Sequence, residues 1–232
     1  MVGMAAGLAR AGFRPFVYGL SAFIPLRVVE QIKLDIAHDQ LPVILIGDGA
    51  GFVYSHLGTS HQSTEDIACT RAIPDLSVYS PADRFELTAC MDMAYQAKAP
   101  VYLRMGKSDR GDVHAAVPHA KTGSLLQAKP GQAGVIAFIA TGSLVRTAMD
   151  IATRSYPDAA VWSTPCIKPM DSQQVATICE QSRLIVVLEE HSVLGGLGSV
   201  ISEIASELAP VRILRVACRI VSHSIAVVTS IC

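Results

Sequence analysis

Residues 41–61 read LPVILIGDGAGFVYSHLGTSH and join an apolar, β-branched run to a glycine-rich loop that ends in a histidine. An apolar run of this kind is typical of a strand that is buried on both faces, as in a parallel sheet covered by helices. Ligands of such sheets bind beyond the carboxyl ends of the strands, where this loop would lie. The stretch therefore predicts an α/β protein with a candidate site at His61.

The same alternation of short apolar runs and helix-period segments recurs along the chain. Strands are expected at residues 15–19, 41–47, 76–79, 100–105, 134–140, 159–163, 184–189 and 211–216. Helices are expected at residues 1–11, 25–38, 63–72, 83–97, 143–154, 171–181 and 196–208. Regular alternation of this kind predicts three-layer α/β units with mainly parallel sheets.

A segment rich in glycine, proline and charge, residues 106–132, interrupts this alternation. The chain has 232 residues, which is enough for two domains of about 100–150 residues each. We place the boundary inside the interrupting segment and predict two consecutive α/β domains, over residues 1–115 and 116–232.

Composition and charge argue against several functional classes. Nineteen Lys and Arg balance 20 Asp and Glu without a basic run, which argues against a nucleic-acid partner. The six cysteines show no CxxC pair, which favours free thiols in a reducing compartment over disulfides or a metal site on this chain. Because Arg215, Arg219 and His223 interrupt the most apolar run, 213–232, we expect a cytoplasmic protein without a membrane partner.

Two side chains in the predicted loops are candidates for chemistry. His61 precedes Ser63 and Asp66, which have the spacing of a helix N-cap and its capping-box partner. The field of a helix N-terminus favours the neutral imidazole, which can accept or donate a proton; a surface-loop histidine is the alternative. Arg104 lies near the end of the run PVYLRM and can bind a phosphate or carboxylate, or form a structural ion pair.

Several linked motifs resemble the transketolase family. AAGLARAGFRPFVYGLSAF (5–23), GTSHQSTEDIACTRAIPDLSVYSPAD (58–83) and APVYLRMG (99–106) resemble its pyrimidine-binding domain. ATGSLVRTAMDIA (140–152) and VVLEEHSVLGGLGSVISEIASE (186–207) look like its C-terminal domain. The similarity is greatest to the separate C-terminal subunit of split transketolases and more distant to 1-deoxyxylulose-5-phosphate synthase.

The resemblance implies roles for particular residues. Phe23 matches the aromatic residue that stacks on the aminopyrimidine ring of thiamine diphosphate, with a core position as the alternative. His61 matches the histidine that points at the reacting carbonyl and transfers protons on the sugar hydroxyl, and Arg104 matches the arginine that binds the sugar phosphate. His191 and residues 195–198 belong to a family motif that we expect to be structural or at an interface.

The function implied by the resemblance is that of the C-terminal subunit, or a fragment, of a thiamine-diphosphate-dependent transketolase, which transfers a two-carbon ketol unit between sugar phosphates. The expected partner is an N-terminal subunit that binds the diphosphate and Mg²⁺, and self-association is also expected. One alternative is a non-catalytic remnant or binding module of the same fold. Others are a 1-deoxyxylulose-5-phosphate synthase and the β-subunit of a 2-oxoacid dehydrogenase, which the TSHQS loop fits less well.

The sequence also departs from the family. The family's glutamate that protonates the aminopyrimidine would lie just before Met1, so we expect a truncated chain that is inactive alone. Gly49 and Leu57 stand where transketolases have a His and an Asp that contact the sugar, which leaves the substrate open. Residues 220–232, IVSHSIAVVTSIC, do not resemble the family's ending. Codons exist for these thirteen residues that, when read one nucleotide earlier, encode a sequence close to that ending. We therefore expect a frameshift at Ile220.

Overall fold

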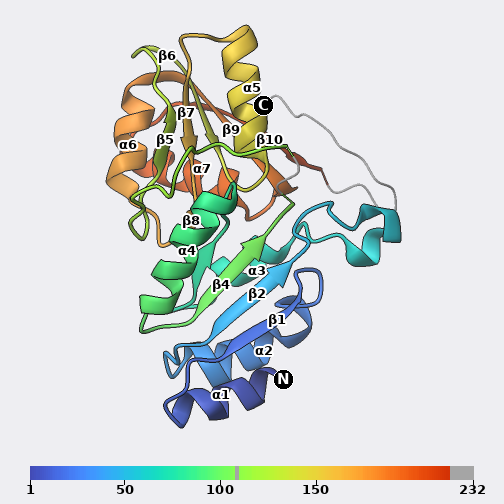
Figure 1. Ribbon diagram of the computed structural model, residues 1–232. Coiled ribbons are helices and arrows are strands. Elements are labelled where there is room, and N and C mark those ends of the chain that lie inside the picture. The colour runs from blue at the N-terminus through green and yellow to red at the C-terminus, as the bar shows by residue number, and fades with distance from the viewer. Residues whose placement is uncertain (108–109, 220–232) are drawn as a thin grey trace.

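The computed structural model describes residues 1–107 and 110–219, and the predicted frameshift at 220–232 lies outside them. The described chain forms two five-stranded sheets, which lie one above the other in Figure 1. The strands of the first sheet, in spatial order, are β1 (Phe16–Leu20), β2 (Ile44–Asp48), β4 (Val101–Met105), β3 (Ser77–Tyr79) and β8 (Cys166–Lys168). β1 to β4 are parallel, whereas β8 comes from the second half of the chain and pairs antiparallel with β3.

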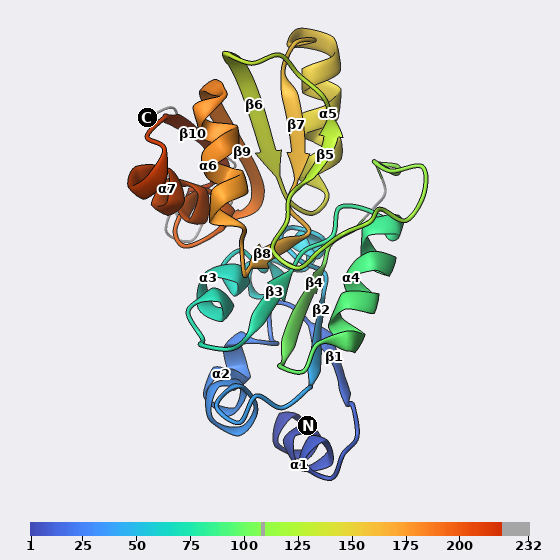
Figure 2. The ribbon, with the colours of Figure 1, turned by 90° about the vertical axis from the view of Figure 1, so that its left-hand side faces the viewer.

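Helices cover both faces of the first sheet. α2 (Val29–Gln31) and α3 (Asp66–Arg71) lie on one side of it and α4 (Arg84–Gln96) on the other, as Figure 2 shows. α1 (Val2–Arg10) buries Val2, Ala5, Ala6 and Ala9 in the same core as α3. These layers leave the carboxyl ends of β1, β2 and β4 facing the second half of the chain.

The second sheet has the same three-layer construction. Its strands, in spatial order, are β10 (Arg212–Cys218), β9 (Ser182–Ser192), β6 (Val135–Ala140), β7 (Ala160–Ser163) and β5 (Leu126–Lys129). All are parallel except β5, which pairs antiparallel with β7. α6 (Ser172–Glu180) and α7 (Leu197–Leu208) cover one face and α5 (Leu144–Ser155) the other (Figure 2).

These sheets confirm the predicted fold class, and each predicted strand and each predicted helix except that at 25–38 is present with its ends shifted by a few residues. Two strands were missed: β5 lies within the segment 106–132 that interrupts the alternation, and β8 is a three-residue strand between Pro165 and Pro169. The expected helix at 25–38 is a succession of irregular turns: η1 (Leu26–Val28), α2 and η2 (Ile32–Ala37), the last a π-helical turn.

The predicted capping box at Ser63 and Asp66 is wrong. α3 begins at Asp66 without a side-chain cap, and the Ser63 hydroxyl is buried without a hydrogen-bond partner. The Asp66 carboxylate turns into the protein and accepts a hydrogen bond from Tyr102. A buried cationic partner, described below, makes this orientation more favourable than capping.

The cysteines of the described residues are free thiols, as the sequence predicts: Cys69, Cys90, Cys166, Cys179 and Cys218. Cys232 lies outside these residues. Burial raises the pKa of the Cys166 thiol to about 12, so this side chain behaves as a core residue and not as a nucleophile. In the described ranges we find no helix both long and apolar enough to cross a bilayer.

His114 contacts the carboxylate of Glu86 in the first domain, and this contact depends on pH. Its Nε2 lies 2.7 Å from Glu86 Oε1, and the hydrogen bond to Glu86 raises the pKa of His114 although burial opposes the shift. Because the folded pKa lies above the unfolded value of about 6.5, the stabilisation is complete below that pH and is lost as pH rises through the folded pKa.

We therefore expect wild-type protein to lose stability between pH 6 and pH 8 relative to His114→Gln, as measured by urea unfolding at each pH. The exposed His119 provides the matched control, since His119→Gln should follow the wild-type profile. If the free energy of unfolding changed with pH in the same way for wild type and His114→Gln, the stabilisation could not be assigned to His114.

Candidate functional site

A closed loop carries His61 at the carboxyl end of β2. It contains two short 3-10 turns, η3 (Ser55–Leu57) and η4 (Thr59–His61), and projects to the right in Figure 1. Gly51 and Ser63 pair across its base in an antiparallel bridge, with both N···O distances 2.9 Å. We call residues 51–63 the His61 loop.

His61 lies against Phe23, so the structure brings two of the predicted site residues together. Their ring centroids are 5.3 Å apart with an interplanar angle of 71°, and both side chains are half-buried. They meet because Leu20 and Asp48 are register partners at the carboxyl ends of the neighbouring parallel strands β1 and β2. The segments that follow these two strands therefore leave the sheet side by side.

The contacts of the His61 ring leave one nitrogen available. Ser60 Oγ lies 3.0 Å from Nδ1, and no hydrogen bond to Nε2 occurs within residues 1–107 and 110–219. If the Ser60 hydroxyl donates to Nδ1, the proton of the neutral ring resides on Nε2. An imidazole oriented through one nitrogen and open at the other can exchange a proton with a bound molecule.

Two tyrosines that sequence reasoning missed support the start of the loop. Asp48 Oδ2 accepts hydrogen bonds from Tyr18 Oη at 2.8 Å and from Tyr54 Oη at 3.0 Å, and these bonds raise the pKa of both phenols. The Tyr54 ring fills the space beside Gly49, where a Cβ atom would come within 2.0 Å of a ring carbon. Gly49 also has φ +74°, so a histidine at this position would displace Tyr54.

Arg104 is buried behind the His61 loop. Its Nε donates to Asp66 Oδ2 at 2.8 Å, and Tyr102 Oη donates to the same oxygen at 2.7 Å. Its Nη2 donates to the carbonyl oxygens of Ser63 and Glu190. Burial has the largest single effect and lowers the pKa of Arg104, but the charge of Asp66, its hydrogen bond and smaller contributions from Tyr102 and Glu190 together raise it above its ordinary value, so the guanidinium is cationic.

This placement favours the ion-pair alternative for Arg104. Its side chain is 4% exposed and that of Asp66 is 0% exposed, so the pair is shielded from solvent. That Arg104 binds a phosphate stays a prediction, and the burial of the guanidinium counts against it. Sequence spacing did not reveal Asp66 as the partner, because the contact joins α3 to β4.

The EEH motif of β9, residues 189–191, contacts the first domain. Glu190 Oε1 accepts a hydrogen bond from the Phe52 amide at 2.9 Å, and His191 Nε2 accepts one from the Ala68 amide at 3.3 Å. Glu189 instead accepts from the amides of Leu197 and Gly198 at the start of α7; burial raises its pKa. The carboxyl end of β9 thus joins the second domain to the His61 loop.

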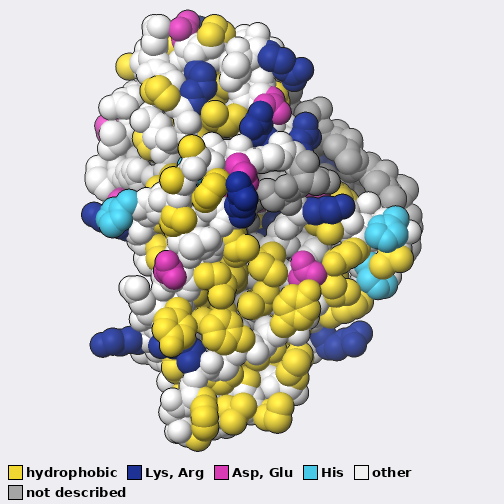
Figure 3. Space-filling model, viewed as in Figure 1, with side chains coloured by type: hydrophobic (Ala, Val, Ile, Leu, Met, Phe, Trp, Pro, Cys, Tyr) yellow, Lys and Arg dark blue, Asp and Glu magenta, His cyan; other side chains and the backbone are white. Residues whose placement is uncertain are grey.

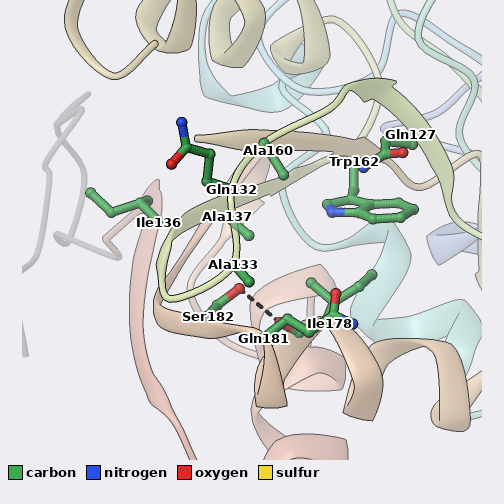
Figure 4. A pocket seen from close by; sticks show the side chains of 11 residues that line it. Gln127, Gln132, Ala133, Ile136, Ala137, Ala160, Trp162, Ile178, Gln181 and Ser182 are labelled. Carbon is green, nitrogen blue, oxygen red and sulfur yellow. Dashed lines mark hydrogen bonds between the residues drawn. The ribbon is translucent and has the colours of Figure 1, made fainter. Parts of the chain in front are cut away.

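Several cavities lie away from Phe23 and His61. One of about 50 Å³ lies at the amino ends of β6 and β7, where Trp162 and Ile178 line it together with polar side chains (Figure 4). Another of about 130 Å³ lies between the domains and is lined by Arg84, Met105 and Ser143. The described part of the chain contains no group of three or more His, Cys, Asp or Glu arranged to hold a metal ion.

Comparison with known families assigns both halves of the chain. Residues 1–111 match the transketolase pyrimidine-binding domain, and residues 129–228 match the transketolase C-terminal domain. A subunit of the apulose-4-phosphate transketolase of Phocaeicola vulgatus is 32% identical over 223 residues, which are 92% of this chain and 69% of the relative. A 6-deoxy-6-sulfo-D-fructose transketolase subunit of Clostridium sp. is also 32% identical, over 94% of this chain and 68% of the relative.

A longer relative and two solved structures agree with this assignment. The 1-deoxy-D-xylulose-5-phosphate synthase of Actinobacillus pleuropneumoniae is 32% identical over 89% of this chain but only 33% of the relative. The structure of a split-gene transketolase, an inactive β4 tetramer, superposes with a TM-score of 0.85 at 31% identity, over 93% of this chain and 70% of that one. Transketolase from Campylobacter jejuni shares the fold, with a TM-score of 0.71 at 18% identity over 93% of this chain and 33% of that one. The chain therefore belongs to the transketolase family and corresponds to its C-terminal half, the pyrimidine-binding domain followed by the C-terminal domain.

Proposed function

We propose that this chain is the second subunit of a thiamine-diphosphate-dependent transketolase, which transfers a two-carbon ketol unit between sugar phosphates. The observation that carries the proposal is the contact between Phe23 and His61 at the carboxyl edge of the first sheet. These residues come from separate segments, and the sequence resemblance implies that they hold the cofactor and the substrate. Similarity to subunits of two split transketolases supports the same assignment.

The residues present fit the pyrimidine end of thiamine diphosphate. Phe23 is an aromatic ring that is only half-buried, and it lies beside an imidazole whose Nε2 has no hydrogen bond in the described chain. When bound, the cofactor supplies the electron sink for breaking and forming the carbon–carbon bond. Phe23 offers its ring to the pyrimidine, and His61 moves a proton between Nε2 and a hydroxyl of the sugar.

The partner proposed for this chain is a subunit with the diphosphate- and Mg²⁺-binding domain. β1 places Phe16 and Tyr18 on the face opposite the buried Val17, and they are 47% and 58% exposed. Figure 3 shows apolar side chains gathered over the lower half of the molecule, which is the first domain. Apolar faces of this kind mark contact surfaces, so we propose that the partner subunit covers β1 and that the chain self-associates without it.

A second candidate is the chemistry of 1-deoxyxylulose-5-phosphate synthase, because that relative is as similar in sequence as the split transketolases. Similarity to a second split-transketolase subunit and to the structure of a split-gene transketolase supports the first candidate. Analysis of the products formed from sugar phosphates, with and without pyruvate, separates the two activities. We also propose a cytoplasmic location, which the free thiols favour, and no nucleic-acid or membrane partner.

The proposed division of the cofactor site predicts that this chain alone binds thiamine diphosphate and Mg²⁺ weakly. The described residues provide an aromatic platform but no carboxylate cluster for the metal ion. Calorimetry should therefore detect tight binding only after the diphosphate-domain subunit is added. Sub-micromolar affinity of the isolated chain would contradict the two-subunit site.

A further inference from the structure

We infer that Glu190 is a positioning residue for His61: its carboxylate, supplied by the second domain, holds the base of the His61 loop. The inference rests on the proposed function of His61 and assigns a part in it to the C-terminal domain. Glu190 lies near the end of β9, and its carboxylate forms hydrogen bonds with Phe52 and Ser143 but none with His61 in the described residues. Its effect must therefore pass through the loop backbone.

The first contact is with the outgoing side of the loop. Glu190 Oε1 lies 2.9 Å from the amide nitrogen of Phe52, the residue that follows the Gly51–Ser63 bridge. A carboxylate that accepts from a backbone amide forms a stronger hydrogen bond than a neutral acceptor. The bond therefore fixes the orientation of the peptide from which the His61 loop departs.

Gly51 shows how closely the Glu190 side chain packs against this peptide. A Cβ atom at Gly51 would lie 2.5 Å from Glu190 Cγ and 3.0 Å from the Glu190 carbonyl oxygen. Gly51 also has φ +65°, a conformation that favours glycine. Glycine at this position thus permits both the turn and the close approach of Glu190.

The second carboxylate oxygen anchors Glu190 to its own domain. Oε2 accepts a hydrogen bond from the hydroxyl of Ser143, which precedes α5, at 3.1 Å. The side chain is therefore held on the second domain by one oxygen and holds Phe52 with the other. This geometry explains a need for a side chain of this length with two hydrogen-bonding groups at its end.

The Glu190 backbone completes the clamp on the returning side of the loop. Arg104 Nη2 donates both to the Glu190 carbonyl oxygen at 2.8 Å and to the Ser63 carbonyl oxygen at 3.1 Å. The two ends of the His61 loop are thus tied to one residue of β9, directly at Phe52 and through Arg104 at Ser63. Displacement of a catalytic group by about 1 Å can cost about 10²-fold in rate, so this clamp matters for turnover.

Hydrogen exchange in the chain itself tests the clamp. Glu190→Ala should speed amide exchange over residues 52–63 by about tenfold or more, because the Phe52 amide loses its acceptor and the loop opens more often. Glu190→Gln should restore near wild-type exchange, since its amide oxygen can accept from Phe52 and its NH₂ can donate to Ser143.

Gln174→Ala is the matched control. Gln174 makes two hydrogen bonds to the backbone of Leu125 inside the second domain, so its loss also removes two bonds but none to the His61 loop. This variant should leave exchange over residues 52–63 unchanged. Equal exchange in wild type and Glu190→Ala, or equal acceleration in Gln174→Ala, would overturn the clamp.

Kinetics of the two-subunit enzyme, reconstituted with a form of this chain that carries the family's glutamate, test the positioning role. Glu190→Ala should lower kcat by about 10–100-fold with little change in KM, and Glu190→Gln should recover most of the rate. Faster loop exchange with an unchanged kcat would overturn the inference. Absence of ketol transfer by the wild-type complex would instead refute the proposed function, while the exchange result would still decide whether the clamp exists.

Discussion

We expect Arg104→Met to lower the free energy of unfolding by about 3–5 kcal/mol, the largest loss of stability predicted for this chain. Methionine keeps much of the volume but removes the cation that pairs with Asp66, whose side chain is 0% exposed. The Asp66 carboxylate would then keep only the Tyr102 hydroxyl as a donor, 2.7 Å away. The carbonyl oxygens of Ser63 and Glu190 would lose a donor as well. Urea unfolding followed by circular dichroism measures the change.

Two comparisons make this test specific. The double variant Arg104→Met/Asp66→Leu should recover a large part of the lost stability, because it leaves no unpaired charge in the core. Arg10→Met removes an exposed ion pair with Asp39 and should change stability little. A loss of less than about 1 kcal/mol in Arg104→Met would show that the buried pair is not a structural element of the fold.

His61→Ala should lower kcat of the reconstituted transketolase by about 10²–10⁴-fold, the range typical of removing a general acid or base. KM should change much less, because the proton transfers assigned to Nε2 contribute mainly in the transition state. Steady-state kinetics with a ketose phosphate donor and an aldose phosphate acceptor would measure both constants. The variant should fold normally, because the His61 ring is half-buried and its neighbours are loop residues.

His56 provides the matched control for this experiment. It is another histidine of the His61 loop, exposed and packed edge-on against Tyr54 with ring centroids 6.4 Å apart. His56→Ala should retain nearly all activity, because the His56 ring packs against Tyr54, whereas the Phe23 ring packs against His61. Equal losses in the two variants would indicate general damage to the loop, and full activity of His61→Ala would exclude a proton-transfer role.

The local order of residues was sufficient to predict the α/β layers. The run at 41–47 became β2, and the apolar, β-branched segments elsewhere became buried parallel strands, because such segments lose the most contact with water when helices cover both faces. The motifs around Phe23 and His61 likewise predicted the family that the comparisons show. Strand β8 was missed because its pairing with β3 forms between distant parts of the chain.

The roles of charged residues depended on the tertiary structure. The sequence by itself determined that Arg104 lies near the end of a strand, that Asp66 lies near a helix start and that residues 189–191 form an EEH motif. Only the folded chain decided that Arg104 pairs with Asp66 and that Glu190 reaches the amide of Phe52. The physical reason is that a buried charge must find its partner in space, whereas sequence spacing reports only neighbours on the same helix or strand.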